Sequence, residues 1–130
     1  IHAAGMYVAA KDFPGDGKRD STAFRAAIAT HVEFVVVDPL NVPSIAVLKE
    51  LGYQGVVISD DLLIGASPPP TAAVRFLKNG GDMVIVSHDI AVADGTYAAI
   101  YGAVLNGSYP RAQLDASVQR LLSLSLRYMP

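Results

Sequence analysis

Cysteine is absent from the 130-residue sequence, which excludes a disulfide framework and thiol chemistry. A basic excess is also absent, because the formal net charge is −2, and this argues against nucleic acid or an anionic membrane surface as a partner. No apolar run approaches the roughly 18 residues of a membrane span, and no signal peptide is visible. His2 and His31 show no metal-ligand spacing with the acidic residues, so we expect neither a metal nor an organic cofactor.

Hydrophobic residues make up 52% of the chain and charged residues 17%, a balance typical of a folded α/β interior. At this length we expect one domain, residues 1–130, with a single core. Four short apolar runs predict β-strands at residues 6–10, 33–37, 55–59 and 83–86. Helical patterns follow them, at residues 20–30, 44–51, 71–79, 91–105 (with a start at 96 as the alternative) and 111–128.

Because strand and helix alternate, we predict about four parallel βα units with right-handed crossovers, plus a C-terminal helix. The strand at residues 55–59 is apolar at successive positions, which predicts that both faces of the sheet are covered. Gly52 is expected to cap the second helix, and Pro70 to lie in the first turn of the third. Tyr97 and Tyr101 in the fourth helix are expected to pack. The apolar stripe of Leu114, Val118, Leu121 and Leu122 in the last helix is expected to pack in the core, with the alternative that part of it covers an exposed sheet edge.

An eight-stranded barrel normally takes about 250 residues, so four βα units make half of one. The predicted fold class is therefore α/β, either a partial (β/α)₈ barrel or a small open sheet. A half barrel has two unpaired sheet edges, which favour self-association or a missing barrel half.

Two adjacent carboxylates, Asp60 and Asp61, follow the strand at residues 55–59. In open and closed α/β sheets, chemistry is placed at the carboxyl ends of the strands. The pair is therefore either part of a functional site or the cap of the next loop or helix, since adjacent acids are common at such starts.

Five segments of the sequence have the residues and the order of a known family. Lys11-Asp12-Phe13-Pro14-Gly15-Asp16-Gly17 is similar to a Lys-His-Phe-Pro-Gly-His-Gly signature, and residues 51–62 are similar to that family's nucleophile strand. Residues 73–75, 79–83 and 114–122 are similar to its next helix, next strand and closing helix. The five segments cover nearly the whole chain. They resemble glycoside hydrolase family 3, and within it the bacterial β-N-acetylglucosaminidases.

The resemblance implies the C-terminal part of a (β/α)₈ barrel domain with shortened loops. It also implies a retaining glycosidase in which Asp60 is the nucleophile and Asp61 is a supporting or helix-capping group. The ammonium group of Lys11 is implied to contact sugar hydroxyls, which suits its three donors. Asp12 and Asp16 are implied to line the sugar pocket, although they stand where the family signature has histidines.

The acid/base residue is not assigned by the resemblance. The nearest match to the family segment that supplies its acid/base histidine is Asp20-Ser21-Thr22, and Thr22 cannot transfer that proton. The segment after the second strand, where the family has another histidine, is cut to Val37-Asp38-Pro39-Leu40. His88 follows the fourth strand and is a candidate sugar contact, although a lone histidine at a strand end is more often a surface loop residue.

The predicted function is hydrolysis of terminal β-linked sugars, with N-acetyl-β-D-glucosaminides derived from cell wall or chitin as the expected carbohydrate substrate. Two alternatives remain open at this point. The first is a non-catalytic fragment or inactive relative that binds sugar or serves assembly. The second is an open flavodoxin-like sheet that binds a phosphorylated ligand, although the glycine-rich segment lacks the Gly-Lys-Ser/Thr ending of a phosphate loop.

Overall fold

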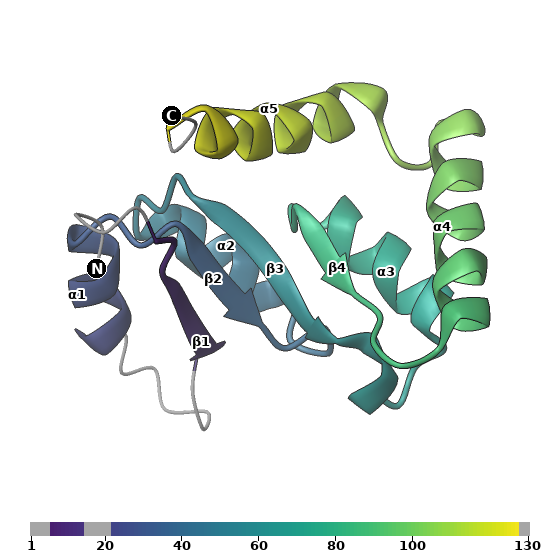
Figure 1. The fold of residues 1–130 in the computed structure, drawn as a ribbon, viewed down its shortest axis with the longest axis horizontal. Helices are drawn as coiled ribbons and strands as arrows, with labels where there is room; N and C mark the ends of the chain where they lie inside the picture. Colours follow the sequence, from purple (N-terminus) through teal and green to yellow (C-terminus); the bar gives the residue numbers. More distant parts are fainter. Residues whose placement is uncertain (1–5, 15–21, 128–130) are drawn as a thin grey trace.

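The computed structural model describes residues 6–14 and 22–127, which form a parallel β-sheet surrounded by helices (Figure 1). The elements in chain order are β1 (Ala9–Phe13), α1 (Thr22–Ala29), β2 (Phe34–Val37), α2 (Pro43–Glu50), β3 (Val56–Asp61), η2 (Leu62–Ile64), α3 (Pro69–Lys78), β4 (Met83–Ile85), α4 (Ile90–Leu105) and α5 (Arg111–Arg127). Within these described ranges, no helix combines the length and the apolar character that crossing a membrane requires.

The sheet has four strands in the order β1-β2-β3-β4, and every neighbouring pair is parallel. Because all crossovers in such a sequential order turn the same way, their helices lie on one face of the sheet. Figure 1 shows α2 and α3 together behind the strands. The arrangement confirms the prediction of a partial (β/α)₈ barrel. It excludes the flavodoxin-like alternative, whose strand order reverses at a switch point.

The main core lies between the sheet and its helices. Val35 and Val37 of β2 are fully buried, as are Ile45 and Leu48 of α2 and Phe76 of α3. These are the residues that the apolar strand runs and the helical spacing place on facing surfaces. Burying a side chain of this size contributes roughly 1.5–3 kcal/mol, so this layer accounts for much of the stability of the fold.

The opposite face of the sheet is only partly covered, contrary to the prediction that both faces are buried. Val36, Ile58 and Met83 are partners in register, so they share this face. Met83 remains 37% exposed, and Ile85, two residues further along β4, remains 40% exposed. No described helix packs over this part of the sheet as α2 and α3 do on the other side (Figure 1). An apolar run in a strand therefore did not, by itself, specify two covering layers.

Helix α5 crosses the sheet at the end where the strands begin (Figure 1). Its anchor is the buried carboxylate of Asp82, which precedes β4. Oδ1 of Asp82 accepts hydrogen bonds from the Ser117 hydroxyl at 2.6 Å and from the Arg120 guanidinium at 2.6 Å. Oδ2 accepts the backbone N–H of Val57 at 2.9 Å. One side chain therefore joins α5, β3 and β4.

The buried face of α5 combines this polar anchor with only part of the apolar stripe, of which Leu114 packs against the main core. Ser117 and Leu124 are buried, whereas Val118 is 42% and Leu122 is 57% exposed. The prediction that Val118 and Leu122 pack in the core is therefore wrong. Tyr97 and Tyr101 of α4 stack on one another with ring centroids 6.1 Å apart, but both remain exposed.

Two predicted boundaries differ from the structure because pairing extends the strands into polar residues. β1 was expected at residues 6–10 but runs over Ala9–Phe13, so that Lys11 belongs to the strand and not to the following turn. β3 continues past Ser59 to Asp61. The predicted helix ends agree with the structure: Gly52 follows α2 with φ of 80°, and α3 begins with prolines in its first turn.

Candidate active site

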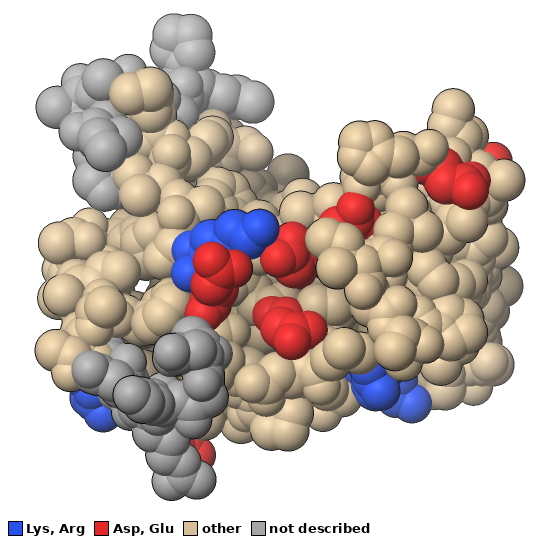
Figure 2. All heavy atoms as spheres, turned by 90° about the horizontal axis from the view of Figure 1, so that it is seen from below, with Lys and Arg blue, Asp and Glu red and all other residues tan. Residues whose placement is uncertain are grey.

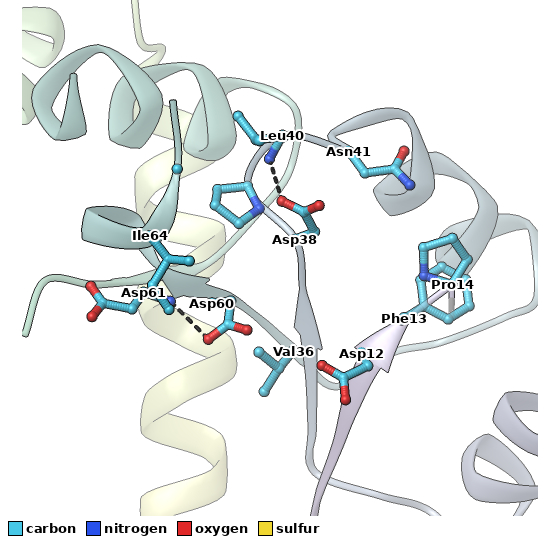
Figure 3. A pocket seen from close by; sticks show the side chains of 12 residues that line it. Asp12, Phe13, Pro14, Val36, Asp38, Leu40, Asn41, Asp60, Asp61 and Ile64 are labelled. Carbon is cyan, nitrogen blue, oxygen red and sulfur yellow. Dashed lines mark hydrogen bonds between the residues drawn. The ribbon is translucent and has the colours of Figure 1, made fainter. Parts of the chain in front are cut away.

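The carboxyl ends of β1, β2 and β3 surround one cavity of about 400 Å³ (Figure 3). This volume lies within the range of roughly 300–1,000 Å³ that is usual for small-molecule sites. On the face where these strands end, acidic side chains gather around a hollow with basic side chains beside them (Figure 2). Twelve residues line the cavity: Asp12, Phe13, Pro14, Val36, Asp38, Pro39, Leu40, Asn41, Asp60, Asp61, Ile64 and Gly65.

Asp60 is positioned by β3 and by two hydrogen-bond donors. Its Oδ1 accepts the backbone N–H of Asp61 at 2.9 Å. Its Oδ2 lies 3.2 Å from Nζ of Lys11. The two side chains are 34% and 58% exposed, so a ligand in the cavity can reach both of them. The sequence placed Asp60 and Lys11 in one site through a family resemblance, and the structure brings them into direct contact.

Asp61 has a different role from that of its neighbour. Its side chain points away from Asp12 and Asp38 (Figure 3). Oδ1 accepts the backbone N–H of Leu63 at 3.1 Å, which caps η2, and Oδ2 accepts the hydroxyl of Ser87. These bonds, the Ser87 hydroxyl foremost and the Leu63 amide second, lower the pKa of Asp61 below its usual value. Asp61 therefore ties the loop after β4 to the end of β3, as expected of a capping group.

Asp12 also lines the cavity, where its backbone adopts φ of 67°. The register between β1 and β2 shifts between Ala10 and Phe13, and Asp12 lies within that shift. Left-handed backbone of this kind is more accessible to aspartate than to most residues. The irregularity therefore directs the carboxylate of Asp12 into the cavity (Figure 3).

Of the two remaining predicted site residues, Asp16 lies outside the described residues. His88 lies on the same rim, in the loop after β4, with an exposed side chain and φ of 64°. It does not line the cavity, although its charge is close enough to contribute weakly, after Ser87 and Leu63, to the lowered pKa of Asp61.

Asp38 is a cavity residue that sequence reasoning did not identify as part of the site. The sequence placed it only in the short segment Val37-Asp38-Pro39-Leu40 after the second strand. In the structure Val37 is the register partner of Ser59, so Asp38 and Asp60 are the next residues outward on neighbouring strands. Both line the cavity. The available signal was an aspartate directly after a buried strand, at the same position relative to β2 as Asp60 is to β3.

A metal site is not apparent in the described part of the chain, because no three His, Asp or Glu side chains converge there as metal ligands. The arrangement instead offers one ammonium group and several carboxylates around a cavity open to solvent. Ammonium groups donate and carboxylates accept hydrogen bonds, which are the two capacities that recognition of sugar hydroxyls requires.

Comparison with solved structures identifies the same fold in longer proteins. A glycoside hydrolase family 3 β-N-acetylglucosaminidase from Paenibacillus sp. str. FPU-7 matches with a TM-score of 0.85 and 26% identity, over 98% of this chain and 32% of that one. A β-N-acetylhexosaminidase from Beutenbergia cavernae matches with a TM-score of 0.73 and 23% identity, over 87% and 39%. The β-N-acetylglucosaminidase from Thermotoga maritima matches with a TM-score of 0.78 and 18% identity, over 92% and 35%.

The chain therefore spans about a third of the length of these structures. No significant match was found among curated protein sequences. The family model of the glycosyl hydrolase family 3 N-terminal domain matches residues 31–124, which is most of the sequence and includes Asp38 and Asp60. Together with the parallel βα architecture and the acidic cavity at the strand ends, this match shows that the chain belongs to glycosyl hydrolase family 3.

Proposed function

We propose that this chain takes part in the retaining hydrolysis of terminal β-linked sugars, with N-acetyl-β-D-glucosaminides as substrates. Three observations support the proposal. They are the family membership, the cavity at the carboxyl ends of the strands, and the printed names of the similar structures, which are β-N-acetylglucosaminidases and a β-N-acetylhexosaminidase. A fourth observation, the contact between Lys11 and Asp60, carries most weight, because it places an ammonium group beside a carboxylate that lines the cavity.

In the proposed reaction, Asp60 is the nucleophile. An oxygen of its carboxylate attacks the anomeric carbon as the bond to the leaving group breaks, which forms a glycosyl-enzyme. Water then releases the sugar and restores the carboxylate. Retention of the anomeric configuration follows from these two successive displacements.

Lys11 has two tasks in this proposal. It holds the Asp60 carboxylate in place before substrate enters, and it donates hydrogen bonds to sugar hydroxyls once the substrate is bound. Asp12 accepts hydrogen bonds from hydroxyls on its side of the cavity. The other two proposed sugar contacts are Asp16 and His88.

The test is a chromogenic assay with 4-nitrophenyl N-acetyl-β-D-glucosaminide. The purified chain is compared with Asp60→Asn and with Asp94→Asn, a control on an exposed face of α4. We expect turnover by the unaltered chain and by the control, and loss of turnover in Asp60→Asn. Nuclear magnetic resonance of the first sugar released is expected to show the β-anomer. Equal, background-level rates in all three proteins would reject the proposal.

A second candidate is a module that binds sugar without cleaving it. One observation that favours it is that each carboxylate oxygen of Asp60 already contacts a donor, the Asp61 amide or the Lys11 ammonium group. Another is that one face of the sheet is partly exposed. This candidate predicts that N-acetylglucosamine binds the chain, that Lys11→Met weakens binding, and that no turnover accompanies it. Isothermal titration calorimetry beside the chromogenic assay separates the two candidates.

A further inference from the structure

We infer that Asp38 is the general acid/base of the glycosidase reaction. The inference rests on the proposed function, which requires a proton donor for the leaving oxygen and does not name one. The sequence has Thr22 where the family resemblance would suggest an acid/base residue, and Thr22 cannot fill that role. The candidates for the proton donor are therefore the side chains that surround the cavity.

Three side chains that line the cavity, other than Asp60, can carry an exchangeable proton: Asp12, Asp38 and Asp61. The side chain of Asp61 points away from Asp12 and Asp38 and is held by Ser87 and Leu63 (Figure 3). Lys11, which is not among the lining residues, is already paired with Asp60. Asp12 and Asp38 remain.

The topology favours Asp38. It follows β2, the direct neighbour of β3, and the register places Asp38 beside Asp60. Residues two apart on a strand share a face, so Asp38 continues the line of Val36, and Asp60 that of Ile58, on the open side of the sheet. Two carboxyl groups from adjacent strands therefore enter one cavity, where they can act on the same bond.

The surroundings of the two carboxyl groups differ in a way that suits different roles. Asp60 contacts an ammonium group and a backbone amide, as a nucleophile that reacts in its charged form should. Oδ1 of Asp38 accepts only the backbone N–H of Leu40, at 2.8 Å. Among the described residues, no cation pairs with Asp38 and nothing donates to its Oδ2. Two carboxyl groups in contrasting environments are the usual basis for dividing nucleophile and acid roles.

The loop that carries Asp38 is fixed on both sides. The bond from Leu40 closes a turn over the carboxyl group, and the guanidinium of Arg75 in α3 donates to the carbonyl oxygen of Pro39 at 3.2 Å. Pro39 is buried and has no backbone N–H. Oδ2 of Asp38 is thus held at the edge of the cavity with its hydrogen-bonding capacity unused.

Protonated Asp38 gives its proton to the glycosidic oxygen while Asp60 forms a bond to the anomeric carbon and the bond to the leaving group breaks. The leaving alcohol departs neutral, and Asp38 is left as a carboxylate. It then takes a proton from water as the water oxygen bonds to the anomeric carbon and the ester bond to Asp60 breaks. Both residues return to their starting states.

The experiment compares Asp38→Asn with a matched control, Asp12→Asn, which also removes one carboxylate from the cavity. Asparagine keeps the oxygen that accepts the Leu40 amide, so the loop is retained. Each variant is assayed on two N-acetyl-β-D-glucosaminides, one with a 2,4-dinitrophenyl leaving group, which needs no proton, and one with a phenyl leaving group, which does. Sodium azide is added as an external nucleophile.

For Asp38→Asn we expect kcat/KM on the phenyl substrate to fall by about 10²- to 10⁴-fold, the usual contribution of a general acid. On the dinitrophenyl substrate kcat/KM is expected to stay within a few fold, while kcat falls and a glycosyl-enzyme accumulates, seen as an increase in intact mass. Azide is expected to restore turnover and to yield a glycosyl azide. Asp12→Asn is expected to lose activity on both substrates alike, without response to azide.

Three results would overturn the inference. In the first, Asp38→Asn loses activity on both substrates equally and azide does not restore it. In the second, Asp38→Asn keeps full activity on the phenyl substrate. In the third, Asp12→Asn, and not Asp38→Asn, is the variant that azide rescues. In each case the unaltered chain is active, so the proposed function survives. If the unaltered chain turns over neither substrate, the proposed function fails, and the assignment of Asp38 fails with it.

Discussion

Nζ of Lys11 lies 3.2 Å from Oδ2 of Asp60, although the two residues come from strands that are not neighbours. Strand β2 lies between them, so the lysine side chain reaches across the open face of the sheet. The four-carbon stem of lysine spans this separation. The pair forms because the carboxyl ends of the strands in a parallel sheet share one rim.

Replacing Lys11 is expected to affect function far more than stability. The pair is partly exposed to solvent, and ion pairs near the surface contribute about 0–1 kcal/mol. Lys11→Met should therefore leave the urea midpoint almost unchanged. A hydrogen bond to a charged group is worth about 1.5–3 kcal/mol, so kcat/KM on the chromogenic substrate should fall about 10- to 100-fold. Lys78→Met, on α3 outside the cavity, is the control, and a comparable loss of activity there would contradict the assignment.

Asp82 is expected to be among the residues most important for stability. Asp82→Ala would leave the Val57 N–H, the Ser117 hydroxyl and the Arg120 guanidinium without their acceptor. Removing one partner of a buried ion pair typically costs about 3–5 kcal/mol. Urea unfolding followed by circular dichroism measures the change in the free energy of unfolding.

Asp115→Ala provides the control for Asp82→Ala. Asp115 is paired with Arg111 on the exposed side of α5, with side chains that are 63% and 84% exposed. We expect this substitution to change the free energy of unfolding by less than about 0.5 kcal/mol. Similar losses in the two variants would show that α5 is not anchored through Asp82.

The bond between Asp61 and Ser87 predicts a specific acid sensitivity. The pKa of Asp61 is lowered in the folded state, so its contribution to stability is present above the usual pKa of 3.8 and is lost as the pH falls through the lowered value. In ¹³C nuclear magnetic resonance titrations, the carboxyl midpoint of Asp61 should lie below 3.8. Ser87→Ala removes the largest cause, so its midpoint should move back toward the usual value. An unchanged midpoint would exclude the Ser87 hydroxyl as that cause.

Two glycines are expected to respond in opposite directions to substitution by alanine. A Cβ at Gly81 would collide with the ring of Phe76, which is fully buried and has no free space to move into. Gly81→Ala should therefore destabilise the chain by about 1–3 kcal/mol. Gly102, within α4, has no atom within 4 Å of such a Cβ. Gly102→Ala should stabilise it by roughly 0.5–1 kcal/mol, because alanine loses less backbone freedom on folding. Thermal unfolding of the two variants provides the comparison.

The alternation of strands and helices was predictable because each element carries a local signal. The β-branched run of β2 and the glycine after α2 depend on residues close together in the chain. The burial of α5 was not predictable in the same way, since it depends on Asp82, which lies 35 residues before Ser117 and carries no pattern that points to it. A polar partner distant in sequence therefore takes part in fixing the buried face, beside Leu114 of the apolar stripe.

The site was predictable to the same extent. The resemblance to family motifs predicted that Asp60 and Lys11 belong to one site, and the structure places them in contact. Asp38 was missed because an Asp-Pro pair after a strand is also an ordinary end of a strand. Only the register between β2 and β3 shows that this aspartate and Asp60 face one cavity. A comparison of the residues that directly follow successive parallel strands would have identified Asp38.

The Asp82 anchor and the cavity lie at opposite ends of the same strands. Substitution of the exposed cavity residues Leu40, Asn41 and Ile64 would therefore alter the cavity walls while leaving the Asp82 anchor of α5 intact. Libraries confined to these three positions should yield a high proportion of folded variants, and selection among them could change which sugar is accepted. The stability of the fold thus depends on the rim where the strands begin, and the choice of sugar on the rim where they end.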